Sequence, residues 1–250
     1  MKIVRYLNGK KAAYGILEGE RVQGCTGTPY TRLKPTGKYH KLNSLKLLAP
    51  CTPSKIIALG WNYRSHAAEF KLTLPTEPLI FLKPSTSVIG PEDKIIYPTS
   101  SHQVDYEGEL GVVIRKRAWQ LPLDEAERYI LGYTCFNDVT ARDLQAKDKQ
   151  WTRAKGFDTF APTGPCIETE LDPSHLSLET YLNGELKQQT NTSDLFFSVP
   201  ELVSFISHVM TLLPGDIIAT GTTSGIGPMQ RGDTIEVRIE KIGTLRNYVA

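Results

Sequence analysis

The sequence predicts an α+β protein that is predominantly β, with peripheral helices and a small β-rich module at its N-terminus. Short runs rich in β-branched and aromatic residues recur between Gly, Pro and Asn turns, which is the pattern of strands. Apolar residues at helical spacing are confined to a few segments. The 250 residues, 40% hydrophobic and 22% charged, have the ordinary composition of a globular protein.

The N-terminal module is expected to span residues 1–53, and the main domain residues 54–250. Strand candidates separated by Gly and Asn turns lie at 2–7, 12–18 and 21–25. A stretch rich in Lys, Pro, Thr and Gly follows at 26–41, where we predict no strand. Two prolines in 47–55 indicate a linker, which places the boundary near Pro53.

Strand candidates dominate the main domain. Asn183 and Gly184 stand between two strand-like runs and predict a type I′ hairpin, because both central residues of that turn need positive φ. Prolines and glycines between the other strand candidates favour a compact β fold. Those candidates are 55–60, 79–83, 94–98, 104–115, 129–137, 216–222 and 233–243.

Few helices are expected. Ser198 and Glu201 form a capping-box pattern at the start of one helix. Its apolar stripe follows at helical spacing: Leu202, Phe205, Ile206, Val209 and Met210. Two shorter helices are predicted within 62–70 and 140–150.

Charge and motifs exclude several classes of function. The net charge of +2 gives no electrostatic reason to bind nucleic acid or an anionic membrane. No apolar run reaches the roughly 18–20 residues of a spanning helix, and the N-terminus has no signal-peptide anatomy. Four cysteines lie far apart without a Cys-x-x-Cys pair, which favours reduced thiols in a cytoplasmic protein.

An acidic strand candidate carries the main functional signal. In "VDYEGELGVVI", Asp105, Glu107 and Glu109 alternate with other residues and therefore project to one face. Three aligned carboxylates repel one another unless basic partners, protonation or a cation neutralise them. Carboxylate oxygens suit Mg²⁺, Ca²⁺ and Mn²⁺. The apolar residues that follow favour a buried metal site, with a solvated strand face as the alternative.

A third acid is available about 30 residues later. Asp138 stands where a strand-like run passes into a predicted helix, a common position for site residues. Asp143 competes with it, although its place within the helical stretch also suits a surface ion pair. We prefer Asp138.

At these residues the sequence resembles the fumarylacetoacetate hydrolase family. The segments "DYEGELGVVI", "FNDVTARDLQ", "KGFDTFAPTGP" and "TGTTSGIG" occur in the order and spacing of that family. The resemblance runs from about position 54 onward and includes the small N-terminal module of many members, such as acylpyruvate hydrolases and 2-hydroxyhepta-2,4-diene-1,7-dioate isomerases. It implies a β-roll with a divalent metal at its mouth, usually Mg²⁺ with Mn²⁺ or Ca²⁺ as alternatives, in a homodimer.

The resemblance also implies roles for particular residues. Glu107, Glu109 and Asp138 match the metal ligands of the family. His66 and Glu69, in "NYRSHAAEF", match an acid–base pair on a short lid helix, where i, i+3 spacing puts them on one face.

Four further residues match positions that contact substrate. Lys155 would bind a substrate carboxylate or stabilise a developing oxyanion, although alone it reads equally as a solvated lysine in a basic stretch. Arg142 and Gln145 follow the metal aspartate and lie one helical turn apart. Thr222 lies in a Gly-rich loop that has neither a Walker lysine nor a G-x-S-x-G elbow.

The resemblance implies metal-dependent chemistry on a small 2-oxo acid through a metal-stabilised enolate. Our first expectation is hydrolysis of the C–C bond of an acylpyruvate-type or fumarylacetoacetate-like substrate. The alternative is an isomerase, tautomerase or decarboxylase of 2-oxo diacids, of the 2-hydroxyhepta-2,4-diene-1,7-dioate or oxaloacetate type. A non-catalytic binding protein is a third class, which the presence of the acid–base pair and the lysine disfavours.

Overall fold

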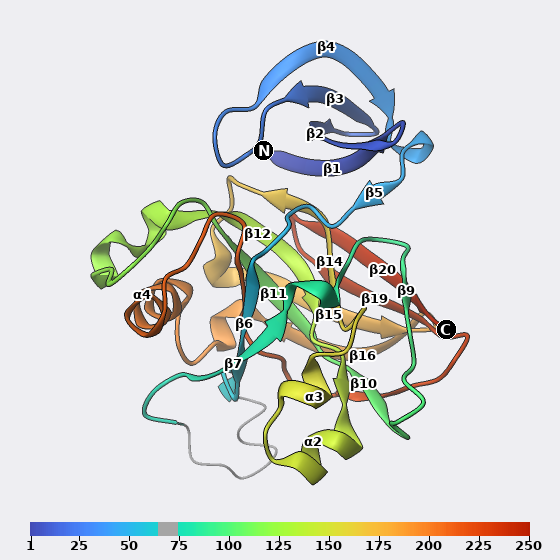
Figure 1. Ribbon diagram of the computed structural model, residues 1–250, viewed down its shortest axis with the longest axis vertical. Helices are drawn as coiled ribbons and strands as arrows, with labels where there is room; N and C mark the ends of the chain where they lie inside the picture. Colours follow the sequence, from blue (N-terminus) through green and yellow to red (C-terminus); the bar gives the residue numbers. More distant parts are fainter. Residues whose placement is uncertain (65–74) are drawn as a thin grey trace.

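The computed structural model describes residues 1–64 and 75–250. Strands predominate and helices are few, so the predicted α+β, mostly β fold is confirmed (Figure 1). Most of the helix expected at 62–70, including His66 and Glu69, lies outside the described residues. In the described part of the chain, no helix is long and apolar enough to cross a membrane.

The N-terminal module is an antiparallel meander, drawn in blue in Figure 1. Its last strand falls within 26–41, where we predicted none. Nearly all of that strand is exposed, so no apolar alternation marked it, and backbone pairing with its neighbour makes it a strand. The four strands are β1 (Lys2–Asn8), β2 (Lys11–Glu18), β3 (Arg21–Thr26) and β4 (Lys34–Lys41).

The meander is continuous with the main sheet of the molecule. The strand order is β4-β3-β2-β1-β14-β12-β11-β17-β6-β7, with β5 paired to β1 and β8 to β14. Val4 and Tyr6 pack in the same apolar cluster as Leu110 of the main domain. The remaining strands of this sheet are β5 (Leu47–Leu48), β6 (Lys55–Gly60), β7 (Leu79–Pro84), β8 (Val88–Ile89), β11 (Gly108–Ile114), β12 (Ile130–Asn137), β14 (Ala161–Glu168) and β17 (Ile217–Ala219).

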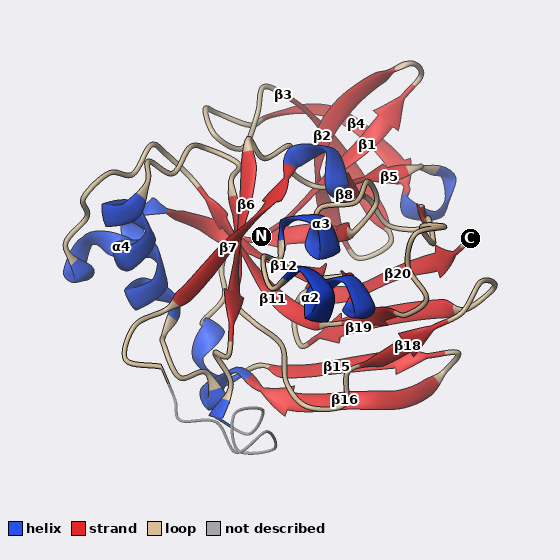
Figure 2. Ribbon diagram, turned by 60° about the horizontal axis from the view of Figure 1, so that its bottom comes forward, coloured by secondary structure: helices blue, strands red, loops and turns tan. Residues whose placement is uncertain are grey.

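Two smaller sheets complete the fold (Figure 2). The predicted hairpin is confirmed, because Asn183 and Gly184 have φ of +52° and +81° between β15 and β16. One sheet has the order β16-β15-β19-β20-β9: β16 (Glu185–Asn191), β15 (Ser177–Leu182), β19 (Thr234–Ile239), β20 (Gly243–Val249) and β9 (Lys94–Ile95). The other has the order β13-β10-β18: β13 (Thr140–Ala141), β10 (Val104–Tyr106) and β18 (Gly227–Met229).

The helices lie at the periphery. The predicted capping box of Ser198 and Glu201 opens α4, but Val209 of the predicted stripe is 55% exposed. The helix predicted within 140–150 is confirmed as α2, which lies beside α3 below the main sheet in Figure 1. The α-helices are α2 (Arg142–Asp148), α3 (Thr152–Lys155) and α4 (Val199–Val209). Short 3₁₀ turns occupy Leu42–Ser44, Ser85–Ser87, Leu123–Tyr129, Pro173–His175 and Thr192–Asp194.

The sequence suggested one continuous strand over 104–115, and this prediction is wrong. The acidic segment breaks at Glu107, so that β10 pairs in the three-stranded sheet and β11 in the main sheet. Side chains replace the missing ladder bonds: Glu107 N donates to Asn137 Oδ1 at 2.9 Å and Gly108 N to Gln188 Oε1 at 2.9 Å. The break brings two sheets together beside the carboxylates.

Candidate metal centre and pocket

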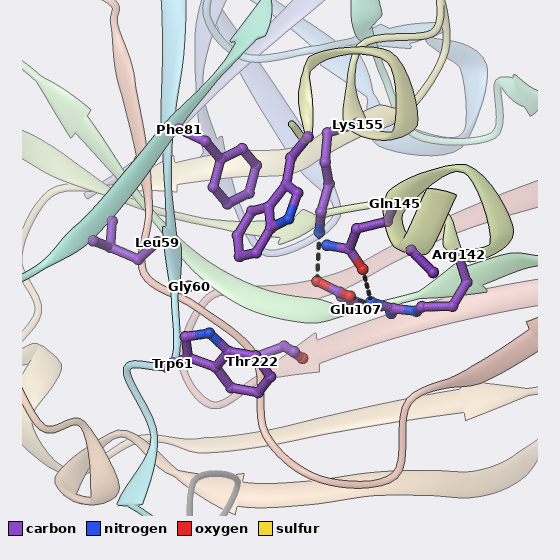
Figure 3. Close-up of a pocket in the computed structure, with 11 residues that line it drawn as sticks. Leu59, Gly60, Trp61, Phe81, Glu107, Arg142, Gln145, Lys155 and Thr222 are labelled. Carbon is purple, nitrogen blue, oxygen red and sulfur yellow. Dashed lines mark hydrogen bonds and ion pairs between the residues drawn. The ribbon is translucent and has the colours of Figure 1, made fainter. Parts of the chain in front are cut away.

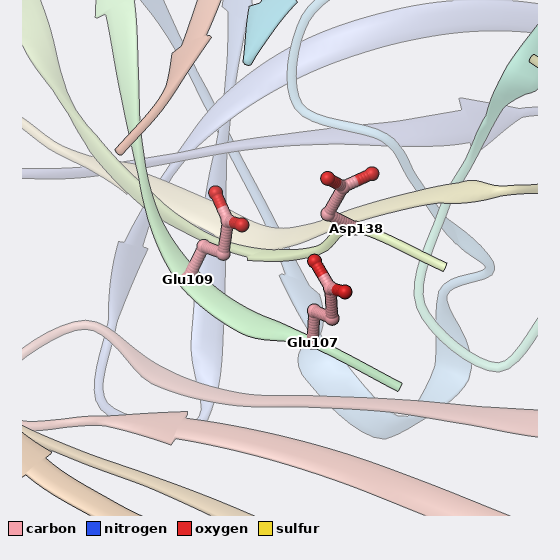
Figure 4. Close-up of side chains that lie close together, drawn as sticks. All are labelled: Glu107, Glu109 and Asp138. Carbon is pink, nitrogen blue, oxygen red and sulfur yellow. The ribbon is translucent and has the colours of Figure 1, made fainter. Parts of the chain in front are cut away.

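Three buried carboxylates converge where β11 begins and β12 ends (Figure 4). Glu107, Glu109 and Asp138 each offer an oxygen, and these atoms all lie within 4.8 Å of one another. Asp138 N donates to Glu107 O at 2.8 Å, which fixes the two chain segments relative to each other. The fold therefore brings together the three residues that the sequence proposed as metal ligands.

Glu109 lacks a full set of partners. Its Oε2 accepts from Gly221 N at 2.8 Å, whereas its buried Oε1 has no hydrogen-bond partner among residues 1–64 and 75–250. Burial, followed by the negative charges of Asp138 and Glu107, raises the pKa of Glu109 well above its usual value. This carboxyl therefore requires either a proton or a cation.

Two lysines face the same cluster from within the protein. Lys155 Nζ lies 2.8 Å from Glu107 Oε2 and 2.5 Å from Asp138 Oδ2. Lys83 Nζ lies 2.5 Å from Asp138 Oδ1, and its side chain is fully buried. Sequence reasoning missed Lys83, since it stands in a strand 55 residues away and no spacing pattern connects it to Asp138.

Arg142 links the acidic segment to α2. Its Nε donates to Asp105 Oδ2 at 2.8 Å, its Nη2 to Glu107, and its Nη1 to Gln145 Oε1 at 2.6 Å. Asp105 is buried and supports the arginine. The competing candidate Asp143 accepts from Ser101 and from the backbone of residue 102, so it caps a loop away from the cluster.

The charges explain the protonation of the cluster. Burial alone would raise the pKa of Glu107, but Lys155 and then Arg142 outweigh it and lower this pKa to about 2. Burial opposes the charge on Lys155, yet Asp138 and Glu107 together raise its pKa. For Lys83, burial outweighs the attraction of Asp138 and lowers the pKa.

The donor set fits a hard divalent cation. The ion pairs of the cluster connect three acids with three bases, so an ionised Glu109, which joins none of these pairs, adds one negative charge in excess among the described residues. A divalent ion would turn that excess into one positive charge, which suits an anionic ligand. The unpartnered Oε1 of Glu109 is available to such an ion, and Mg²⁺ and Mn²⁺ prefer carboxylate oxygens.

A pocket of about 280 Å³ opens beside the cluster (Figure 3). Lys155 and Arg142 reach Glu107 from different sides, with Gln145 next to the arginine. The opposite wall is apolar and aromatic. The lining residues are Leu59, Gly60, Trp61, Phe81, Glu107, Arg142, Gln145, Ala146, Trp151, Lys155 and Thr222.

The sequence analysis did not predict most of the aromatic wall of the pocket. Phe81 of β7 and Trp151 before α3 meet edge to face, with ring centroids 5.0 Å apart, although they are 70 positions apart. Trp61 has φ of +58°, a conformation that is costly for a bulky residue and recurs at functional sites. Arg64, considered a partner for a distal carboxylate, instead donates to Leu195 O at 2.7 Å.

The predicted site residues thus fall into two groups. Lys155, Arg142, Gln145 and Thr222 all line the pocket, as expected of substrate contacts, and their roles stay predictions. His66 and Glu69 lie outside the described residues, so their predicted roles also stay predictions.

A mostly β fold with a buried carboxylate cluster that could hold a divalent cation beside a pocket is the arrangement of a family of enzymes. The family model "Fumarylacetoacetate (FAA) hydrolase C-terminal" matches residues 55–250, and "Rv2993c-like, N-terminal" matches residues 1–50. The chain belongs to the fumarylacetoacetate hydrolase family.

Relatives cover the whole chain. Protein Rv2993c of Mycobacterium tuberculosis is 44% identical over 100% of this chain and 98% of its own length. Oxaloacetate tautomerase FAHD2B, mitochondrial, of Bos taurus is 40% identical over 83% of this chain and 70% of its own.

Solved structures agree with this assignment. The 5-carboxymethyl-2-hydroxymuconate delta-isomerase of Mycobacterium smegmatis superposes with a TM-score of 0.94 at 44% identity, covering 100% of this chain and 99% of that one. Maleylpyruvate hydrolase of Sphingobium sp. SYK-6, in complex with manganese(II) and pyruvate, has a TM-score of 0.84 at 28% identity, covering 100% and 99%.

Proposed function

We propose that the protein catalyses proton transfer next to the ketone of a small 2-oxo acid, as a divalent-metal-dependent isomerase or tautomerase. The observation that carries the proposal is the buried cluster of Glu107, Glu109 and Asp138 beside a pocket lined by Lys155 and Arg142. Mg²⁺ or Mn²⁺ bound there would act as a Lewis acid toward the 2-oxo group.

The side chains around the cluster supply orientation and charge. The Lys155 ammonium lies between Glu107 and Asp138 and lines the pocket, so it can face negative charge that develops on a bound substrate. Arg142 is held by Asp105 and Glu107, so its guanidinium is fixed before substrate arrives.

The other pocket walls hold and shield the substrate. The amide of Gln145 lies beside the arginine and offers a directional contact to a carboxylate. Phe81 and Trp151 present an apolar wall that excludes water from the reacting carbon. His66 and Glu69 remain the candidates for moving the proton, on the strength of the motif.

Hydrolysis of an acylpyruvate, our first expectation from the sequence, becomes the second candidate. The named isomerase and tautomerase are 44% and 40% identical to this chain, whereas the fumarylacetoacetate hydrolase of Exiguobacterium antarcticum is 35% identical and the maleylpyruvate hydrolase 28% identical. The maleylpyruvate hydrolase was solved with manganese(II) and pyruvate, which supports C–C cleavage as a second reaction for a pocket of this kind.

A two-substrate assay tests the proposal. Enol oxaloacetate and an acylpyruvate are each mixed with Mg²⁺-loaded protein, and products are followed by ultraviolet absorbance and proton NMR. We expect accelerated enol-to-keto conversion with all carbons retained. Release of pyruvate from the acylpyruvate, without faster conversion of the enol, would replace the proposal with hydrolysis.

Substitutions assign the reaction to this pocket. Lys155→Met should lower kcat for the conversion at least about 100-fold, whereas Lys187→Met, which removes an ion pair with the exposed Glu185, should leave it unchanged. His66→Ala should abolish turnover while Mn²⁺ affinity stays nearly constant. Full turnover in Lys155→Met or in His66→Ala would contradict the role assigned to that residue.

A further inference from the structure

Gln188 lies behind the carboxylates and occupies no position that the family motifs marked. It stands on β16, in the five-stranded sheet, and its side chain is 1% exposed. A buried amide must satisfy two donors and one acceptor within the protein. Its partners therefore show what the residue positions.

The three hydrogen bonds of the Gln188 side-chain amide join it to the segment that carries the carboxylates and to the loop of Thr222. Its Oε1 accepts from Gly108 N at 2.9 Å, the residue between Glu107 and Glu109. Its Nε2 donates to Thr222 Oγ1 at 2.9 Å and to Thr223 O at 3.0 Å.

Thr222 closes these bonds into a ring. Its hydroxyl donates to Gly108 O at 3.0 Å, so Gly108, Gln188 and Thr222 each donate once around the ring. The neighbouring Gly221 N donates to Glu109 Oε2 at 2.8 Å. One side chain from a different sheet thus fixes both the break in the acidic segment and the loop that holds Glu109.

We propose that Gln188 is a positioning residue that sets the geometry of the metal ligands, acting through Gly108 and Thr222. The inference rests on the proposed metal-dependent function and adds a residue from outside the pocket. Glu107 lies at the break between β10 and β11, and Glu109 lies two residues further on within β11, so their relative placement depends on the side-chain hydrogen bonds that hold this break. Partners that orient ligands in this way typically change metal affinity or activity 10- to 100-fold when removed.

Calorimetric titration of the full chain with Mn²⁺ tests the inference without reference to any substrate. Gln188→Met keeps the volume and removes all three bonds, and we expect its Kd for Mn²⁺ to rise about 10- to 100-fold. Gln189→Met is the matched control on the same strand, because Gln189 is exposed and makes a 3.4 Å contact with Glu179. Its Kd should stay within about twofold of wild type.

A second variant distinguishes loss of the ring from misfolding of Gln188→Met. Thr222→Val breaks the ring from its other side, and its Kd should rise in the same direction. The double variant should lose little more than Gln188→Met alone, because both changes break one ring. An unchanged Kd in Gln188→Met, or fully additive losses, would overturn the positioning role. If the wild-type protein binds no Mn²⁺, the proposed function fails instead.

Discussion

Glu109 is the residue on which the properties of the metal centre depend. Its buried Oε1 has no hydrogen-bond partner in the described part of the chain, and burial together with two neighbouring carboxylates raises the pKa of Glu109. In the metal-free protein the raised pKa favours the protonated carboxyl, and a proton there offsets the excess negative charge of the cluster. A divalent cation would take over that role and displace the proton, which would couple metal binding to pH.

Replacement of Glu109 by Gln should therefore weaken metal binding and catalysis together. The amide cannot offer a charged oxygen, so we expect the Kd for Mn²⁺ to rise about 100-fold, in the range of lost ligands and their partners. Wild-type protein should release a proton on binding, seen as a dependence of the calorimetric enthalpy on buffer ionisation. Glu179→Gln, away from the cluster, serves as the control. Retained affinity and activity in Glu109→Gln would refute the ligand assignment.

The same residue predicts how the stability of the metal-free protein depends on pH. A carboxyl whose pKa is raised on folding contributes stability that is fully present below its unfolded pKa, near 4.5, and is lost as pH rises through the folded pKa. Glu107, with its pKa lowered to about 2, contributes above 4.5 and loses that contribution on acidification.

Urea unfolding in EDTA between pH 5 and about 8 measures this dependence. The free energy of unfolding should fall with rising pH in wild type, and Glu109→Gln should remove that part of the slope. An identical slope in the variant would show that Glu109 is already ionised in the folded, metal-free protein. Saturating Mg²⁺ should also abolish the decline, since bound metal favours the ionised carboxylate.

Lys83 supplies a fully buried ammonium group to Asp138. Among the described residues, Lys83→Met would leave the buried Asp138 paired with Lys155 alone. Breaking a buried pair costs about 3–5 kcal/mol, so we expect a loss of that order in the free energy of unfolding. Lys46→Met, which removes an exposed pair with Asp93, should cost less than about 1 kcal/mol. Equal losses in the two variants would contradict the special position of Lys83.

For single residues, the sequence predicted which carboxylates could bind a metal, but it did not predict which side chains contact them in the fold. Glu107, Glu109 and Asp138 could be proposed because carboxylates on a strand and at a strand end have a recognisable pattern. Lys83 and Gln188 could not, because each reaches the cluster from a strand 55 or 80 positions away along the chain. Only the pairing of whole strands decides which side chains meet there.

Among the elements, the break between β10 and β11 does most to shape the centre. Gly108 follows it as the first residue of β11, and a Cβ on Gly108 would lie 2.1 Å from Thr180 Oγ1 of β15. The hairpin of β15 and β16 thus packs directly against the backbone between the two glutamates. Glycine is required by this contact and not by an unusual φ.

Gly108→Ala should therefore push the acidic segment away from the hairpin and weaken Mn²⁺ binding. Thr180 Oγ1 has no hydrogen-bond partner among the residues that the structure describes, so Thr180→Ala removes the obstructing atom at small cost and should restore much of the affinity in the double variant. Thr180→Val keeps the bulk and serves as the control that should not rescue. Calorimetric titration distinguishes these outcomes, and normal binding by Gly108→Ala would contradict the packing argument.

Local patterns predicted those elements that carry local signals. The Asn183–Gly184 turn and the capping box of α4 are confirmed because their geometry is set by adjacent residues. The break at Glu107 was missed, since it is imposed by side chains from β12 and β16. β4 was missed because an exposed edge strand needs no apolar face.

For the whole molecule, the question is whether the N-terminal module is a separate unit. Two family models divide the chain at about residue 50. The backbone nevertheless joins the parts, since Lys2 and Ile3 of β1 pair with β14, and the N-terminal amine lies 2.5 Å from Glu168 Oε1. Val22 of β3 packs in the same apolar cluster as strands of the main domain.

We therefore expect the chain to unfold in one cooperative transition despite its two family segments. The module buries three side chains against the main domain: Ile3, Val4 and Val22. Exposure of each such side chain costs about 1.5–3 kcal/mol, so neither part should unfold without destabilising the other. Scanning calorimetry should give equal calorimetric and van't Hoff enthalpies. Val22→Ala should lower the Tm of that single transition, whereas a substitution at the exposed Leu186 should leave the Tm unchanged. Two resolved transitions, with only the smaller one shifted by Val22→Ala, would instead show that the module folds independently of the metal centre.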